Sequence, residues 1–325
     1  MNIRSILAVA LLCASQAALA KKAPLPMPLA PQLQVEVILN QQEMGVDVPA
    51  TAGAIGAQFG ILGALIGAMI TSSEVATAEK HVADIRNLLI DYHFNESFER
   101  TIRAKLASDG ISPNPQITFM ASPWDAETAK RAGKVSADGI LIIVPRFSIY
   151  NNFELMTVQM SVSSVNRTVK PDGKIKQKVV FFRNYVMQFP LDKIAGNNSL
   201  EDSQRWIALG KQGMAALLDA GVDQVVDMIV YDFSAQGRQE SSVKAAHENA
   251  DFHGKTYSGR KVRADPNWIW VRARGNVGLY GITGYYPLSG IASLPVAAPA
   301  VAPAVAPVAA PVAVPATTPP PGSQQ

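Results

Sequence analysis

Cysteine is nearly absent from this sequence. Of its 325 residues only Cys13 is a cysteine, and it lies within the first twenty residues. Those residues resemble a secretory signal peptide, because Arg4 precedes an apolar run and residues 18–20 form a small-x-small cleavage site. Leu12 occupies the position where a lipoprotein signal has a small residue, so lipidation is not expected. Cleavage would leave a chain without cysteine, which excludes disulfides, thiolate nucleophiles and cysteine–metal sites.

A large excess of charge is absent as well. The chain has 29 Lys and Arg residues against 26 Asp and Glu residues, and its formal net charge is +3. Binding to nucleic acid would need a concentrated basic face, which this balance does not indicate. The composition therefore predicts no nucleic-acid partner.

Motifs for catalysis are missing too. The sequence contains no G-x-S-x-G nucleophile elbow and no G-x-x-x-x-G-K-[ST] phosphate loop. Of the four histidines, His247 and His253 are close in sequence, but their spacing matches no metalloprotease or zinc finger. We therefore predict no enzyme, no catalytic residue, no metal site and no cofactor, and an unrecognised enzyme is the least favoured alternative.

The two ends of the expected mature chain have biased compositions. Residues 21–32 contain four prolines and predict an extended linker. Residues 294–325 consist almost wholly of Ala, Val and Pro, without a charged or aromatic side chain, and predict polyproline II or disorder. This tail is interpreted as a spacer or a dispensable extension.

Residues 33–233 between these ends predict a globular α+β domain, with a mostly antiparallel sheet and helices packed on one face. Three strand-like runs at 138–150, 153–169 and 174–189 are separated by short turns and form an expected meander. One face of the middle run is apolar and should be buried, namely that of Met156, Val158, Met160 and Val162. A further strand is expected at 33–39, where apolar and polar residues alternate.

Helical periodicity appears on both sides of the meander. Apolar residues three and four apart predict a long helix from residue 75, a break near residues 93–95 with Asn95 as a new cap, and an end at Gly110. A short helix is expected at 125–135. Ser199 and Asp202 predict the start of another long helix. Residues 234–263 are predicted to be a polar loop, and residues 264–293 a hairpin region whose aromatic residues anchor a sheet edge.

The stretch 51–74 is unusually rich in glycine. It holds Gly53, Gly56, Gly60, Gly63 and Gly67, and no charged residue occurs between Asp47 and Glu74. Small residues recur every fourth position in Gly56-x-x-x-Gly60-x-x-x-Ala64-x-x-x-Ala68 and in Gly63-x-x-x-Gly67. This pattern resembles the glycine-zipper segments of bacterial envelope proteins, over about twenty-five residues only. The resemblance implies close helix packing at these five glycines and no particular activity.

The role of this segment has two main alternatives. Its length suffices to span a bilayer, but no Lys, Arg, Trp or Tyr closely flanks it. After a cleaved signal peptide, a single crossing would also leave the large domain in the cytoplasm, which is an unusual use of export. We predict an exported envelope protein, in the periplasm or associated with the outer membrane, with a structural or assembly role. It would self-associate, or contact a membrane or outer-membrane partner, through the glycine-zipper insertion at 49–72. The alternative is a soluble periplasmic binding or chaperone-like module with the segment buried in its own core, and a small-molecule ligand is left open.

Overall fold

The computed structural model describes residues 33–47, 73–108, 111–112, 115–121, 137–172, 175–242, 248–272 and 280–288. Five predicted features lie outside the described residues: the signal peptide, the linker, the glycine-zipper segment, the short helix at 125–135 and the C-terminal tail. The chain divides into two units, Met1–Leu294 and Pro295–Gln325.

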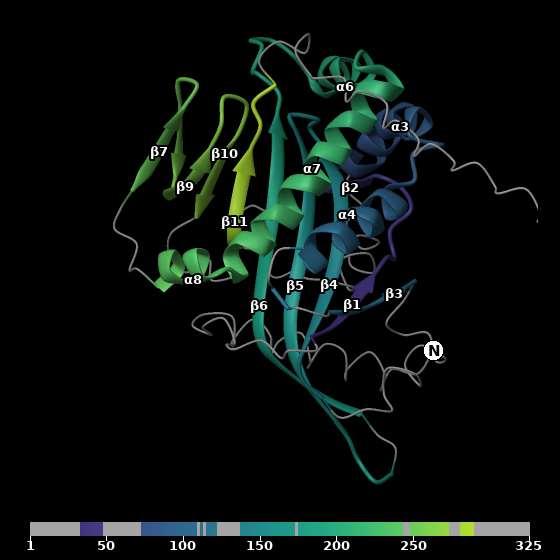
Figure 1. Cartoon of the computed structure of the whole chain (residues 1–325). Coiled ribbons are helices and arrows are strands. Elements are labelled where there is room, and N and C mark those ends of the chain that lie inside the picture. The colour runs from purple at the N-terminus through teal and green to yellow at the C-terminus, as the bar shows by residue number, and fades with distance from the viewer. Residues whose placement is uncertain are drawn as a thin grey trace, which may run out of the picture. The chain divides into compact units, whose positions relative to one another are not determined.

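A large mixed sheet organises the first unit (Figure 1). Its described strands are β1 (Gln34–Ile38), β2 (Gly45–Asp47), β3 (Gln116–Met120), β4 (Ala137–Tyr150), β5 (Leu155–Val169), β6 (Ile175–Pro190), β9 (Arg260–Ala264), β10 (Ile269–Arg272) and β11 (Tyr280–Tyr285). They run in the order β3-β1-β4-β5-β6-β11-β10-β9, and β2 pairs with β4. A separate two-stranded sheet pairs β7 (Asn249–Phe252) with β8 (Lys255–Ser258).

The expected meander is present as β4, β5 and β6, which pair in antiparallel directions. Parallel pairs flank it, because β1 lies parallel between β3 and β4, and β11 lies parallel to β6. Parallel strands need a long crossover, and helices provide it on both sides. The α+β class is thus confirmed. The sheet is mixed, so the prediction that it is mostly antiparallel is not confirmed.

The described helices are α3 (Ser73–Leu88), α4 (Phe94–Ser108), α6 (Ser199–Ile207), α7 (Gly210–Phe233) and α8 (Ala235–Ser242). Helix α7 packs across β5, β6 and β11, and α4 packs beside α7 (Figure 1). The main core lies between these helices and the sheet. Met156, Val158, Met160 and Val162 are all 0% exposed, so the prediction of the buried face is confirmed.

The helix boundaries differ from the predictions in three places. Asn198, not Ser199, caps α6. Its side chain accepts hydrogen bonds from the first turn, and its backbone amide donates to the carboxylate of Glu201. Asp202 cannot fill that role because it is buried and bonded to neighbouring side chains. The expected single long helix is broken at Gly210, whose φ of 63° is left-handed. Helix α4 begins at Phe94, so Asn95 is inside it.

The prediction of a polar loop at 234–263 is wrong. This stretch forms α8, β7, β8 and β9. Its strands can be polar because they lie at or beyond a sheet edge and bury only part of one face, against Ile269 and Val271. The expected late hairpin is present, since β10 and β11 pair in antiparallel directions. Trp270 in β10 is fully buried and anchors that edge, as predicted.

Candidate functional site

A groove opens at the ends of β4, β6 and β11, on the face of the sheet opposite to the helices. Alternate residues of β6 face opposite sides of the sheet. Met187 and Phe189 lie in the core that the helices cover, whereas Gln188 and Pro190 line the groove on the other face. Its volume is about 250 Å³. The lining residues are Tyr150, Glu154, Leu155, Gln188, Pro190, Leu191, Lys193, Lys255, Tyr257 and Tyr285.

One wall of the groove is aromatic. The rings of Tyr257 and Tyr285 lie 4.0 Å apart between centroids, with an interplanar angle of 32°. The hydroxyl oxygen of Tyr257 is buried and has no hydrogen-bond partner among the described parts of the chain. Burial raises the pKa of Tyr257 above its ordinary value, and the nearby Lys255 partly opposes this. The phenol therefore stays protonated at neutral pH and keeps a donor that a bound molecule could use.

Charges of both signs border this wall. Lys255 Nζ lies 2.8 Å from Asp192 Oδ1, and Lys193 Nζ lies 3.7 Å from Glu154 Oε1. All four side chains are more than 40% exposed, so these ion pairs add little stability. Because the pairs are weak, either lysine can turn to a ligand anion at low cost.

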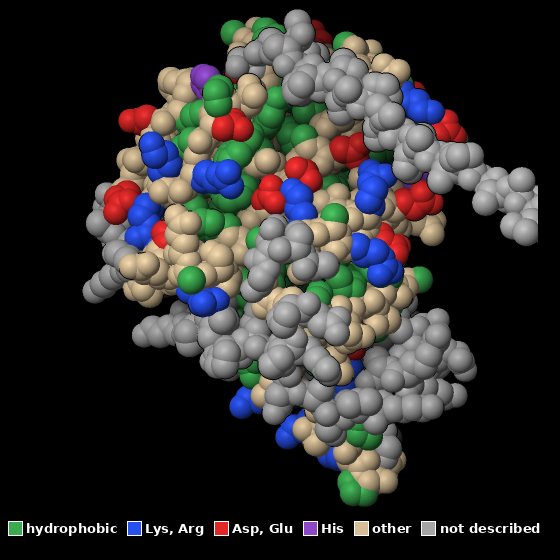
Figure 2. Space-filling view, in the orientation of Figure 1, with side chains coloured by type: hydrophobic (Ala, Val, Ile, Leu, Met, Phe, Trp, Pro, Cys, Tyr) green, Lys and Arg blue, Asp and Glu red, His purple; other side chains and the backbone are tan. Residues whose placement is uncertain are grey.

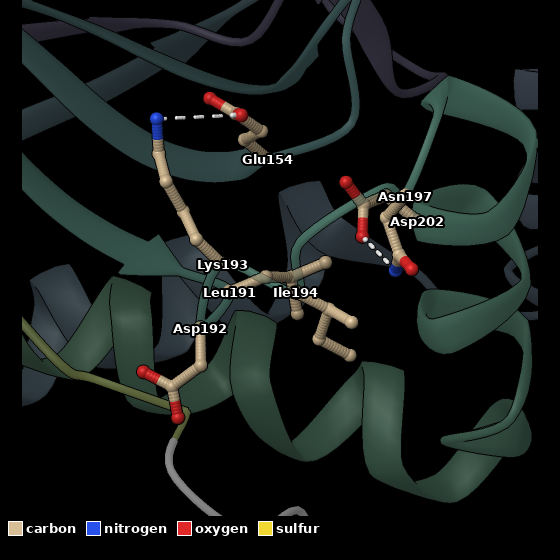
Figure 3. A pocket seen from close by; sticks show the side chains of 7 residues that line it. All are labelled: Glu154, Leu191, Asp192, Lys193, Ile194, Asn197 and Asp202. Carbon is tan, nitrogen blue, oxygen red and sulfur yellow. Dashed lines mark hydrogen bonds and ion pairs between the residues drawn. The ribbon is translucent and has the colours of Figure 1, made fainter.

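A smaller pocket of about 60 Å³ adjoins the groove (Figure 3). It shares Glu154, Leu191 and Lys193 with the groove, and Figure 3 shows Asn197 and Asp202 on its other side. Asp202 accepts hydrogen bonds from Asn197 at 3.1 Å and from Arg205 at 3.0 Å. This carboxylate is already satisfied, and the space suits a few water molecules rather than a substrate.

A buried ionic cluster joins α7 and α8 to the C-terminal strands. Arg272 Nη2 lies 2.6 Å from Asp232 Oδ1, and Arg272 Nε donates to Glu240 Oε2 at 2.8 Å. Tyr185 donates to Asp232 Oδ2 at 2.7 Å, and burial, followed by the charge of Asp232, raises the pKa of Tyr185 well above its usual range. Arg260 also pairs with Glu240. The members pair with one another, although the buried Nε of Arg260 has no hydrogen-bond partner among the described residues. They line neither of the two pockets, so we interpret the cluster as a structural clamp.

The structure does not test the site residues predicted from the sequence. Gly53, Gly56, Gly60, Gly63 and Gly67 all lie outside the described residues. His247 does too, and His253 is exposed, with Nε2 2.7 Å from the carbonyl of Pro266. Within the described ranges no group of three or more side chains could hold a metal ion.

The groove was not predicted from the sequence. Tyr257 falls in the stretch predicted to be a loop, and Tyr150 is separated from it by more than one hundred residues of sequence. Tyr285 lies in the hairpin region whose aromatic residues predict a sheet-edge anchor in preference to a ligand platform. The grouping of those tyrosines near glycines is the sequence signal that could have indicated the groove.

Comparison with protein-family models, with curated proteins and with solved structures finds no match to this chain. Among the helices that the structure describes, none has both the length and the apolar character needed to cross a membrane.

Proposed function

We propose that this protein is an exported component of a bacterial cell envelope that assembles with copies of itself through residues 49–72. The observation that carries the proposal is where this segment joins the fold. β1 and β2 precede it, and the strands that they pair with follow it. β1 lies between β3 and β4, with Val35 opposite Leu141 and Val37 opposite Ile143. The segment therefore leaves one domain and returns to the same domain.

This connection argues against a single membrane crossing. A crossing between β2 and α3 would place β1 and β4 on opposite sides of the bilayer, where they could not pair. The flanks are also fixed to the body: Gln41 donates to the carbonyl of Phe147 at 2.6 Å, and Arg86 in α3 donates to the carbonyl of Met44 at 2.9 Å. A glycine-rich apolar segment whose two flanks are anchored to the domain suits contact with another copy, because small residues let two backbones approach closely.

The assembly proposal predicts that filling the small-residue ridge weakens self-association. Gly60→Leu combined with Gly63→Leu should raise the dissociation constant of the oligomer by about tenfold or more, since overpacking an interface costs about 1–3 kcal/mol. The measurement is light scattering coupled to chromatography in mild detergent over a concentration series. Ile61→Leu with Ile66→Leu is the control, because it alters the same segment away from the ridge. A wild-type monomer that stays a monomer in both variants would refute the proposal. Release by alkaline carbonate would exclude integral insertion in the membrane.

A second candidate function is favoured by the groove, namely that of a soluble binding module. Stacked tyrosines beside two lysines suit a small amphipathic molecule with a planar apolar part and an anionic group. The probe 1-anilinonaphthalene-8-sulfonate has this chemistry. We expect saturable binding of one molecule, weakened about tenfold by Tyr257→Ala, because the lost aromatic contact is worth on the order of 1–1.5 kcal/mol.

The matched control for the groove is Tyr231→Ala, which removes a partly buried tyrosine from α7 outside the groove. Fluorescence titration measures both variants against the wild type. Equal affinity in all three proteins would mean that the probe binds elsewhere. This outcome would contradict the proposal that the groove binds a ligand.

A further inference from the structure

The hairpin formed by the ends of β5 and β6 reaches beyond the end of β4. It is here called the arm and comprises residues 166–178 of the sequence, of which residues 173 and 174 lie outside the described residues. The last pair between β4 and β5 joins Ala137 to Arg167, whereas pairing between β5 and β6 continues to Val169 and Ile175. Figure 1 shows this hairpin projecting from the lower end of the sheet, away from the helices. The arm adds nothing to the core between sheet and helices, so its role must be sought outside that core.

The arm carries a concentrated positive charge. In the sequence it has five Lys and Arg residues and one acidic residue, an excess larger than the net charge of +3 of the whole chain. Figure 2 shows Lys and Arg side chains along this narrow end of the molecule. The small net charge of the whole chain therefore does not reveal that the arm is strongly basic.

The charge of the arm is also largely unneutralised. At its base, Arg167 is buried and held by Glu36 through two contacts of 2.6 and 2.7 Å. Lys170, Lys176 and Lys178 are exposed and form no ion pair found within the described parts of the chain, and Asp172 is the one acidic residue of the arm. Elsewhere, exposed lysines such as Lys211 and Lys255 are in ion pairs. The arm therefore presents free ammonium groups to a partner.

We propose that this arm docks on a lipid surface rich in anionic headgroups. Lysines near such a surface gain from its negative potential, and a projecting hairpin can reach it without strain in the body. Exposed Pro171 and half-buried Val169 at the tip add apolar surface suited to the headgroup boundary. The arm has no aromatic residue on which nucleic-acid bases could stack, which argues against single-stranded nucleic acid as the partner.

The arm and the glycine-zipper segment leave the fold at opposite ends of β4. β2, which precedes the segment, pairs with Ser148–Tyr150, whereas the arm begins beside Ala137. At about 3.3 Å per residue these ends are about 40 Å apart. The inference thus goes beyond the proposed self-assembly and can fail or succeed independently of it.

The test is binding of the full chain to vesicles of phosphatidylcholine, with or without phosphatidylglycerol, measured by co-sedimentation. Replacing Lys170, Lys176 and Lys178 with Gln should weaken binding to the anionic vesicles by about fivefold per lysine, or on the order of 100-fold in total. Wild-type binding should fall steeply as salt is added, because exposed charges are screened. Binding to neutral vesicles should be weak and equal in both proteins.

The control replaces Lys80, Lys211 and Lys261 with Gln, which removes the same charge from exposed positions off the arm. This variant should bind anionic vesicles within about twofold of the wild type, since its lysines lie more than a Debye length from the arm's contact. Circular dichroism and thermal unfolding establish that all variants fold. The proposal is overturned if the arm variant binds like the wild type or if both triple variants lose equal affinity. It is also overturned if duplex DNA is bound while anionic vesicles are not.

Discussion

Replacing Arg272 with methionine is expected to lower the free energy of unfolding by about 3–5 kcal/mol. Asp232, which is 1% exposed, would lose its cationic partner, and Glu240 would lose one of two. Methionine fills much of the same volume but neutralises neither carboxylate, so a buried charge is left uncompensated. Urea unfolding followed by far-ultraviolet circular dichroism measures the change.

Two further variants separate this cost from ordinary surface effects. Arg103→Met breaks the pair with Glu99 on α4, where both side chains are more than one third exposed, and should change stability by less than about 1 kcal/mol. Asp232→Leu in the Arg272→Met background should recover part of the loss, because the uncompensated charge is then gone. Similar losses in Arg272→Met and Arg103→Met would show that the cluster contributes no more than a surface pair.

The antiparallel part of the fold was predictable because its signal is local. Alternation along β5 identifies its buried face, and the turn at 170–173 sets the register with β6 over only a few residues. The position of β1 was not predictable, since nothing near Val35 or Val37 specifies partners that lie about one hundred residues later. Periodicity tells which face is buried but not which strand lies alongside.

The prediction failed at the late polar strands for a different reason. β9 keeps polar and charged side chains such as Lys261 and Arg263 exposed at the sheet edge, so its composition looks like that of a loop. Tertiary pairing with β10 determines its conformation, and composition alone cannot show that pairing. The groove depends on the same pairing, because Tyr257 and Tyr285 meet only after β8 has folded beside the late hairpin.

The basic arm illustrates a related limit. Its lysines are visible in the sequence, but a charged strand usually has acidic neighbours across the sheet. Only the end of β4 at Ala137 shows that Lys176 lies beyond that strand, whereas Lys178 pairs with Asn166 beside the first residues of β4. Composition averaged over the chain correctly indicated no overall basic character, and it could not reveal a local excess at one extremity.

Replacing Trp206 with alanine is expected to cost about 3–5 kcal/mol of unfolding free energy. Its side chain is 0% exposed, and its Nε1 donates to the carbonyl of Phe153 at 2.8 Å. Phe153 has a φ of 59°, a left-handed conformation that a bulky residue adopts only when its surroundings hold it there. Trp206 therefore fills the core under α6 and also fixes the turn between β4 and β5, whose Glu154 lines both pockets.

The variant Trp206→Phe separates these two contributions. It retains much of the volume and removes the donor, so the buried carbonyl of Phe153 is left unpaired at a cost of about 1–3 kcal/mol. Chemical denaturation should give the lowest free energy of unfolding for Trp206→Ala and a higher one for Trp206→Phe. It should give the highest of the three for Trp268→Ala, whose ring is only partly buried. A loss in Trp206→Phe as large as that in Trp206→Ala would show that the hydrogen bond to the turn, rather than packing, dominates. A negligible loss in Trp206→Phe would instead show that packing alone holds the strained turn beside the groove.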